Sequence, residues 1–348
     1  MPDQLSITLF KSIESNYYTE KKNLVDDVSE LLHIQKSSVY KKIKGESAIG
    51  LQEAGILCKH YKISLDELLN LNENRIYFDF PAIRGNVKNV YDFLKSLETD
   101  LQNLYRLDPT IYYATKELPM FYYCISPKLA AFKFHVFYNT VWREDKYQMI
   151  PFDYIQFEND DQFKSQIKNI VNLYMSLHSV EIWNVGILDN TLNQIRYFLE
   201  SGLMKNPLES IRLCEELLLL IKNIEELCEN SNKSSMKKSD RAVGSFELYN
   251  NEIAHTNILA YVESKSMRCV YNTYDNPNFM KSYNPSLCDY TSKWFNRIID
   301  TSAPISKGNV RDRKMFINRL QEKVNRTLKT VELIIEEHLS NTQNQRCV

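Results

Sequence analysis

The stretch DDVSELLHIQKSSVYKKIKGE, residues 26–46, decides what the N-terminal part of the chain can form. It opens with an apolar-patterned segment in which Ser29 is small enough for two helices to cross, and Ile34 and Val39 have the spacing of inward-facing anchors. Four lysines follow within nine residues: Lys36, Lys41, Lys42 and Lys44. No acid occurs between Gln35 and Gly45. The pattern indicates two short helices joined by a tight turn, although a lysine-rich helix is often only a solvated face.

The surrounding sequence favours a small all-helical domain rather than an isolated basic helix. Apolar residues recur at spacings of three and four, which is the period of an amphipathic helix. The segment SLDE, residues 64–67, has the capping-box spacing of a helix start. We therefore predict five short helices, over residues 5–18, 24–32, 36–44, 51–61 and from 64 onward.

These residues resemble a known DNA-binding family. VDDVSELLHIQKSSVYKKIKGE (25–46) and LQEAGILCKHYKISLDELL (51–69) are similar to the Cro/C1-type (XRE-like) helix-turn-helix of bacterial and phage repressors. The resemblance spans residues 5–71 and departs from the family pattern at three positions. His33 replaces the usual turn glycine, Val25 replaces a phosphate-contacting Gln, and Gln35 replaces a capping Ser or Thr. A helix-turn-helix geometry requires His33 to adopt a positive φ.

The resemblance implies a recognition helix over residues 36–44 that enters the major groove of double-stranded DNA. Its implied DNA-binding residues are Lys36, Ser37, Tyr40, Lys41, Lys42 and Lys44. Lys36 could donate to the O6/N7 edge of guanine, whereas Lys44, and Lys42 beside it, would contact phosphate. A homodimer is expected, because one short recognition helix contacts too few bases.

The remainder of the chain is predicted as a series of regions. Residues 1–72 form the helix-turn-helix domain, 73–86 a linker, 87–230 a helical region, 231–241 a polar loop and 242–340 an α+β region. The Tyr- and Val-rich stretches after residue 242 predict two to four antiparallel strands. The predicted fold class is mainly α, with a five-helix Cro/C1-like N-terminal domain, a helical region and a small α+β C-terminal part containing a short antiparallel sheet.

A wider resemblance extends beyond the DNA-binding region. YYATKELPMFYYCISPKLAAFKFHVFYNTVW (112–142), ELYNNEI (247–253) and SAPISKGNVRDRKMFINRLQEKV (302–324) resemble parts of uncharacterised bacterial regulators with a long C-terminal region. The first of these segments gathers aromatic residues near Lys116, Lys133 and His135. It could line a pocket for an unknown small-molecule effector, or it could be packed core. His135 is interpreted as a core or surface histidine rather than a catalytic base.

A second basic segment lies near the C-terminus. Residues 307–329 contain eight Lys or Arg and two acids. This segment could assist DNA binding or recognise an anionic effector, and the alternative is a solvated amphipathic helix.

Composition excludes several function classes. The formal net charge of −1 means that any DNA binding must come from a local patch. Seven scattered cysteines, never spaced C-x-x-C, predict neither disulfides nor a zinc site. We also expect no other metal site and no cofactor, since no carboxylate ladder or nucleotide-binding motif occurs. Without an apolar run of about 20 residues or a signal sequence, a cytoplasmic protein that makes no membrane contact is expected.

The sequence therefore predicts a bacterial, sequence-specific DNA-binding transcriptional regulator whose C-terminal region serves dimerisation, effector sensing or both. Catalytic motifs of the common hydrolase, nucleotide-binding and metalloprotease types are missing, so we predict no enzyme and no catalytic residues. Two alternatives stay open. The helix-turn-helix fold could serve protein interactions without specific DNA binding, or the C-terminal region could be the dominant part as a small-molecule sensor or enzyme.

Overall fold

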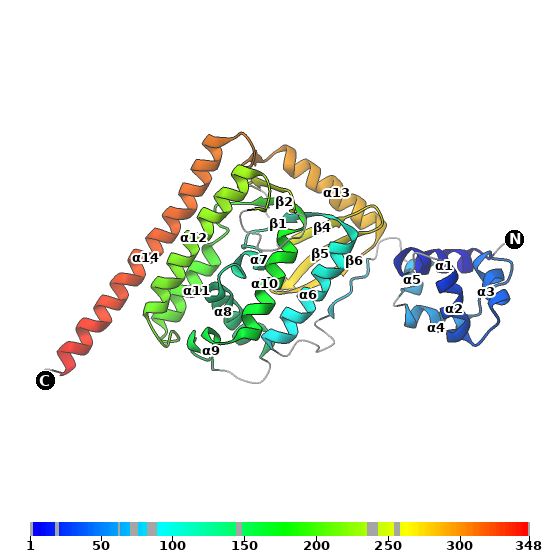
Figure 1. Ribbon diagram of the computed structural model, residues 1–348, viewed down its shortest axis with the longest axis horizontal. Coiled ribbons are helices and arrows are strands. Elements are labelled where there is room, and N and C mark those ends of the chain that lie inside the picture. Colours follow the sequence, from blue (N-terminus) through cyan, green and yellow to red (C-terminus); the bar gives the residue numbers. More distant parts are fainter. Residues whose placement is uncertain are drawn as a thin grey trace. The chain divides into compact units, whose positions relative to one another are not determined.

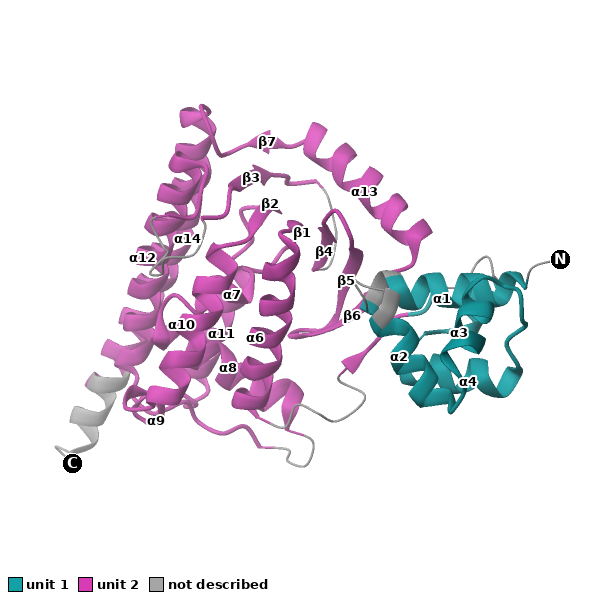
Figure 2. Cartoon of the chain, turned by 45° about the vertical axis from the view of Figure 1, so that its right-hand side comes forward, with its two compact units in different colours: residues 1–77 teal, residues 78–348 magenta. Residues whose placement is uncertain are grey.

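The computed structural model divides the chain into two compact units, Met1–Tyr77 (unit 1) and Phe78–Val348 (unit 2) (Figure 2). It describes residues 3–17, 21–61, 63–69, 76–81, 89–143, 148–234, 243–253 and 258–346. Residues 73–75 and 82–86 of the predicted linker, and 235–241 of the predicted loop, lie outside the described residues.

Unit 1 contains the five predicted helices. They are α1 (Gln4–Tyr17), α2 (Lys21–Leu32), α3 (Lys36–Ile43), α4 (Leu51–His60) and α5 (Leu65–Leu68). The predicted apolar stripes form one core, in which Leu9, Val28 and Leu57 are fully buried. Val39 of α3 belongs to the same core and is also fully buried. Packing of this apolar face holds the short helices in place, because helices of this length are marginal on their own.

The helices of unit 2 lie within the predicted helical region 87–230, except for the last two, which begin in the predicted α+β region. They are α6 (Val90–Leu107), α7 (Met120–Tyr123), α8 (Pro127–Phe137) continued by the π-helical segment η2 (Tyr138–Trp142), α9 (Ile155–Glu158), α10 (Asp161–Met175), α11 (Asp189–Glu200), α12 (Leu208–Asn230), α13 (Pro285–Asp300) and α14 (Val310–Arg346). Side-chain caps fix four of the starts. Asn89 begins α6, Ser126 begins α8, Asp160 begins α10 and Asn284 begins α13, each by accepting a backbone N–H of the first turn.

A mixed seven-stranded sheet organises unit 2, with strand order β6-β5-β4-β1-β2-β3-β7. The strands are β1 (Thr110–Ala114), β2 (His178–Trp183), β3 (Phe246–Asn250), β4 (Leu259–Glu263), β5 (Arg268–Asp275), β6 (Asn278–Ser282) and β7 (Ala303–Pro304). β1, β2 and β3 run parallel to one another. The other four strands join this centre in antiparallel pairings.

The two faces of the sheet are covered unequally (Figure 1). A thick helical layer that includes α6, α8, α10 and α12 covers one face, and its core takes in Ile111, Trp183 and Leu248 from the strands. The opposite face packs against α13, where Ala114 and Ile182 meet Phe295. Because both faces of β1 and β2 are covered, these central strands are not amphipathic.

The predicted fold class is wrong for unit 2. The chain is 61% helical, but its C-terminal part carries a seven-stranded mixed sheet rather than a short antiparallel one. The error has a physical cause. The strands TIYYA and HSVEIW are five and six residues long and lie between helices, and their two-sided burial removes the alternation that identifies half-buried strands. As a result β2 and β3, which pair in parallel, lie in two regions that were predicted to be separate.

Candidate nucleic-acid interface and ligand cavity

The turn between α2 and α3 has the geometry that a helix-turn-helix requires. His33 adopts the left-handed conformation with a φ of 54°, which confirms the expectation for this position. The His33 N–H donates to Glu30 O at 3.3 Å, and the Ile34 N–H donates to Ser29 O at 3.1 Å, the bond pair of a Schellman motif. The Ser29 hydroxyl also donates to Ile34 O at 2.7 Å. The small residue at the crossing therefore helps to close the turn.

Replacing His33 by Gly should stabilise this turn. A left-handed L-residue is strained by its Cβ, and glycine removes that strain while adding unfolded-state entropy, so we expect a net gain of about 1 kcal/mol. Native-state hydrogen exchange of the α2 and α3 amides would measure it in the full chain, as about fivefold slower exchange. His33→Ala retains the Cβ and serves as the control. An equal gain in both variants would contradict the assignment of the strain to backbone geometry.

The end of α3 is fixed in a similar way by Gly45. This glycine has a φ of 70°, and the N–H groups of Gly45 and Glu46 donate to Lys42 O and Lys41 O at 3.0 and 2.8 Å. A Cβ at Gly45 would lie 2.8 Å from Cδ1 of Ile7 in α1. Glycine is therefore required at this position both by the left-handed backbone and by the close approach of α1.

One predicted DNA-binding residue is placed away from the surface. Lys42 is 8% exposed, and its ammonium group donates to Ala48 O at 2.9 Å and to Glu53 Oε2 at 2.8 Å. Glu53 Oε2 also accepts the N–H of Gly50 at the start of α4. Lys42 thus ties α3 to α4, and we exclude it from the candidate interface. The helical spacing held a signal for this, because position 42 follows the inward position 39 by three residues and so borders the buried face.

The other five predicted residues share one exposed face of α3. They are Lys36, Ser37, Tyr40, Lys41 and Lys44. The opposite face is buried through Val39 and Ile43. The structure therefore brings together three cations, a hydroxyl group and the phenol of Tyr40, which is 42% exposed, on the solvent-exposed face of α3.

Two acids from α2 modify this face. The ammonium of Lys36 lies 2.7 Å from Asp26 Oδ1, and both side chains are largely exposed. Hydrogen bonding to Asp26 raises the pKa of Lys36, and the charge of Glu30 adds to this effect. The start of α3 is consequently less positive than its lysines suggest. Sequence reasoning missed these acids because they precede the turn and reach α3 only through the folding of the helix pair.

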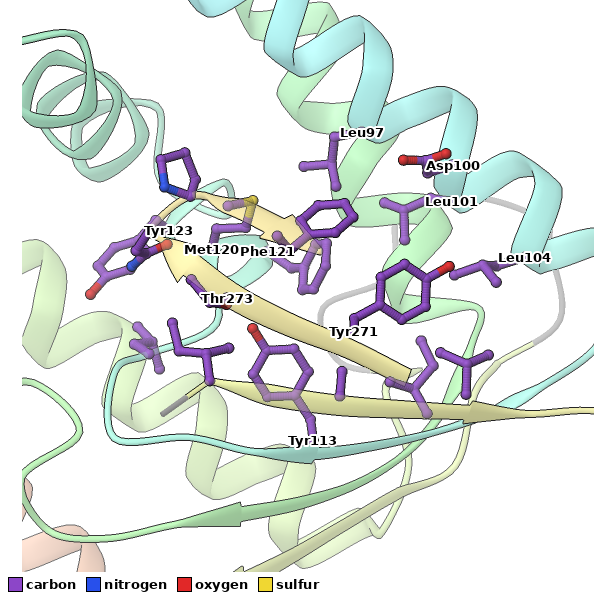
Figure 3. A pocket seen from close by; sticks show the side chains of 18 of the residues that line it. Leu97, Asp100, Leu101, Leu104, Tyr113, Met120, Phe121, Tyr123, Tyr271 and Thr273 are labelled. Atoms are coloured by element: carbon purple, nitrogen blue, oxygen red, sulfur yellow. The ribbon is translucent and has the colours of Figure 1, made fainter. Parts of the chain in front are cut away.

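Unit 2 contains a cavity between the helical layer and the sheet (Figure 3). Its volume is about 100 Å³. The walls come from α6, α7, α8, β1, β4 and β5, and also from the turn that joins β5 to β6. Most of the lining is apolar, including Leu101, Met120 and Phe121, and the polar groups include Asp100 and Tyr113. A largely apolar cavity with a few polar groups is the usual form of a small-molecule site.

The predicted aromatic pocket at residues 112–142 coincides with this cavity in part. Lys133 lines the cavity, together with Tyr123 and Phe137. His135 is 8% exposed and does not line it; its Nε2 lies 2.8 Å from Ile150 O, and burial lowers the pKa of its imidazole. Lys116 is exposed at a different, smaller depression. The α6 and β5 parts of the lining were missed because they are remote in sequence.

A polar network neutralises Lys133 at one end of the cavity. Lys133 is 2% exposed, and its ammonium group donates to Glu117 Oε1 and to Gln194 Oε1 at 3.0 Å. Asn190 and Asn276 donate to the same Glu117 carboxylate at 3.1 and 2.8 Å. Burial is the main influence on the pKa of Lys133 and lowers it, while the charge of Glu117 opposes that shift. This lysine is therefore a paired structural cation.

The basic segment 307–329 is largely engaged within unit 2. Lys307, Lys314 and Lys323 form ion pairs of 2.6, 2.6 and 2.7 Å with Glu247, Glu225 and Asp189. Arg313 is 4% exposed and donates to backbone oxygens near the start of α14. These contacts fasten α14 to its neighbours, so the packing role accounts for half of the segment's eight cations.

The described residues contain neither a metal-ligand cluster nor a helix that could span a bilayer. That part of the chain holds no group of three or more His, Cys, Asp or Glu side chains arranged to bind a metal ion. None of its helices has both the length and the apolar character needed to span a bilayer. Comparisons with protein-family models, with curated proteins and with solved structures found no match.

Proposed function

We propose that the chain is a bacterial, sequence-specific DNA-binding transcriptional regulator that inserts α3 into the major groove. The observation that carries the proposal is the left-handed turn at His33 combined with the exposed basic face of α3. This combination gives a recognition helix held by its buried side while its other side is free to contact DNA. The proposal places the protein in the cytoplasm and assigns it no catalytic activity.

Each exposed residue has a distinct proposed role. Lys36, in the first turn of α3, is placed to donate to the O6/N7 edge of guanine, and Lys44 at the end is placed to contact phosphate. Ser37 and Tyr40 face the groove between them, and Lys41 adds positive charge. Because α3 has eight residues, one copy reads few base pairs. We therefore propose that the protein binds as a homodimer to two half-sites.

Selection of bound fragments from a randomised DNA duplex library tests this function directly. The full chain should enrich one motif at near-physiological salt. A dimer should select inverted half-sites about 10 base pairs apart, centre to centre, or a multiple of that spacing. Failure to enrich any motif would overturn the proposal and favour the alternative in which unit 1 is a protein-interaction module.

The Asp26–Lys36 ion pair leads to a second prediction. Asp26→Asn removes a carboxylate that would repel phosphates and releases the Lys36 ammonium for DNA. We expect several-fold tighter binding to the selected site, and a salt slope that is steeper by about 0.9 if Lys36 then neutralises one further phosphate. Fluorescence anisotropy over a range of salt concentrations measures both quantities.

Asp66→Asn is the matched control for this variant, because it removes an exposed acid from α5. Its DNA affinity should stay close to that of the parent protein. Weaker binding by Asp26→Asn would show instead that Asp26 orients Lys36 for a base contact, which would contradict the predicted competition.

We further propose that unit 2 provides effector sensing through its cavity. The cavity supports this role because it has the apolar lining and sparse polar groups of a small-molecule site. Under this proposal, the ligand binds the DNA-free and DNA-bound states of the protein with different affinities. The ratio of these two affinities sets how much the bound ligand changes the DNA affinity of unit 1.

A further inference from the structure

The ionisable groups of the cavity differ in how well they are compensated. Lys133, the lining lysine, is paired with Glu117 and surrounded by amide groups. Asp100 lies on α6, away from Tyr123 and its end of the cavity (Figure 3). Within the described part of the chain, its carboxylate accepts no hydrogen bond and belongs to no ion pair. The charge still to be balanced in this cavity is therefore negative.

The surroundings of Asp100 strengthen this point. Burial raises the pKa of its carboxyl group, and the more distant charge of Lys281 on β6 lowers it. Burial is the larger effect, so the site destabilises the negative charge of the Asp100 carboxylate and provides no ion-pair partner for it among the described residues. A carboxylate in this position gains most from a partner that brings a positive charge and hydrogen-bond donors together.

The walls near Asp100 suit the rest of such a ligand. Leu101 and Leu104 lie beside Asp100 on α6, and Phe121, Tyr113 and Tyr271 contribute aromatic rings to the cavity (Figure 3). Aromatic rings attract cations through their electron-rich faces, and apolar walls favour a hydrocarbon body. An anionic ligand would instead be repelled by the carboxylate of Asp100. It would also find no unpaired cation among the residues that line the cavity, because Lys133 is paired with Glu117.

We propose that this cavity binds a small primary amine, whose hydrocarbon or aromatic body fills the apolar walls and whose ammonium group pairs with Asp100. The volume of about 100 Å³ limits the body to at most one ring, since a cavity of about 150 Å³ holds a single benzene. The proposal deepens the effector role of unit 2 and rests on that role for its biological meaning. Binding of the amine itself does not depend on whether unit 1 recognises DNA.

Three ligands that share a benzene ring and differ in charge test the inference: benzylamine, benzyl alcohol and benzoate. Calorimetric titration of the full chain at pH 7 should give the tightest binding for benzylamine, at least tenfold tighter than for benzyl alcohol, with benzoate weakest. Asp100→Asn should weaken benzylamine binding at least tenfold and change benzyl alcohol binding by less than threefold. This pattern isolates the charge interaction from burial of the ring.

A cavity-filling variant shows where the ligand binds. Ala260 on β4 lines the cavity, so Ala260→Phe should abolish the binding of benzylamine and benzyl alcohol alike. The tryptophan residues, Trp142, Trp183 and Trp294, all lie in unit 2, and their fluorescence during thermal unfolding shows whether each variant is folded. If Ala260→Phe does not fold, Leu104→Phe narrows the same cavity from α6 and takes its place.

Four results would overturn the inference. They are benzoate binding more tightly than benzylamine, equal binding of amine and alcohol, no binding by any of the three, or an unaltered benzylamine affinity in Asp100→Asn. These outcomes are separate from the DNA selection. If the chain binds benzylamine but enriches no DNA motif, the amine site is retained and the proposed regulatory function is contradicted. If the chain enriches a DNA motif but does not bind benzylamine, only the amine site is contradicted.

Discussion

The triple variant Lys36→Ala, Lys41→Ala, Lys44→Ala should abolish specific DNA binding, with at least a hundredfold loss of affinity for the selected site. The three ammonium groups project from the exposed face of α3, so their removal takes away both base contacts and phosphate neutralisation. The magnitude of the slope of log K against log salt should decrease by about 0.9 for each lysine that neutralises a phosphate, and by about 2.7 if all three do. Fluorescence anisotropy between low and physiological salt measures both effects.

The single variants divide this loss into two kinds. Lys36→Ala should relax base preference at one position of the site, whereas Lys44→Ala should weaken binding to all sequences alike. The double variant Lys11→Ala, Lys59→Ala is the control, since it removes exposed cations from α1 and α4. Unchanged affinity and an unchanged salt slope in the triple variant would remove α3 from the groove.

Unit 1 could be predicted closely from sequence because its signals are local. The positions of Ser29, Ile34 and Val39 and the glycine at 45 are set by helix geometry over about twenty residues. His33 shows the same principle, since the hydrogen bonds of a Schellman turn demand a left-handed residue whatever its side chain. What sequence could not show was the tertiary charge pattern, in which Asp26 approaches Lys36 and Glu53 holds Lys42.

Unit 2 was harder because its organising contacts are remote in sequence. β1 pairs with β2 in the register Thr110 to His178 and with β4 in the register Thr110 to Glu263. No local sequence pattern predicts such strand pairings. Burial on both faces also removes the apolar–polar alternation by which the strands themselves could be identified. The cavity illustrates the same limit. Its aromatic wall at Phe121 and Tyr123 lies in the predicted region, while Asp100 and Tyr271 come from α6 and β5.

Glu181→Gln should cause the largest loss of stability in unit 2, about 3 kcal/mol at pH 7. The Glu181 carboxylate on β2 is fully buried. It accepts hydrogen bonds from the hydroxyls of Tyr122 and Tyr174 at 2.7 Å each, from Ser179 at 2.9 Å and from the indole N–H of Trp183 at 3.1 Å. A glutamine has nearly the same shape, but even with its carbonyl oxygen at the Oε1 position it places an amide donor against the indole N–H of Trp183, and it removes the negative charge.

The stability loss should depend on pH through Lys233, which is fully buried. Burial lowers the pKa of the Lys233 ammonium to about 8, and the charge of Glu181 counteracts that shift. Below pH 8 the folded protein therefore contains a buried cation that Glu181 helps to compensate, and Glu181→Gln removes this compensation. Above the folded-state pKa the amine is neutral in the folded state, so this part of the loss disappears as the pH rises.

Urea unfolding followed by tryptophan fluorescence measures the effect, since all three tryptophans report on unit 2. We expect the difference between Glu181→Gln and the parent chain to be larger at pH 7 than at pH 9.5. Glu263→Gln is the matched control, because Glu263 is half-buried and accepts a hydrogen bond from the Tyr261 hydroxyl at 3.0 Å; it should cost less than about 1 kcal/mol. An equal cost for the two variants at pH 7 would contradict the central role of the Glu181 network, and a pH-independent cost would remove Lys233 from it.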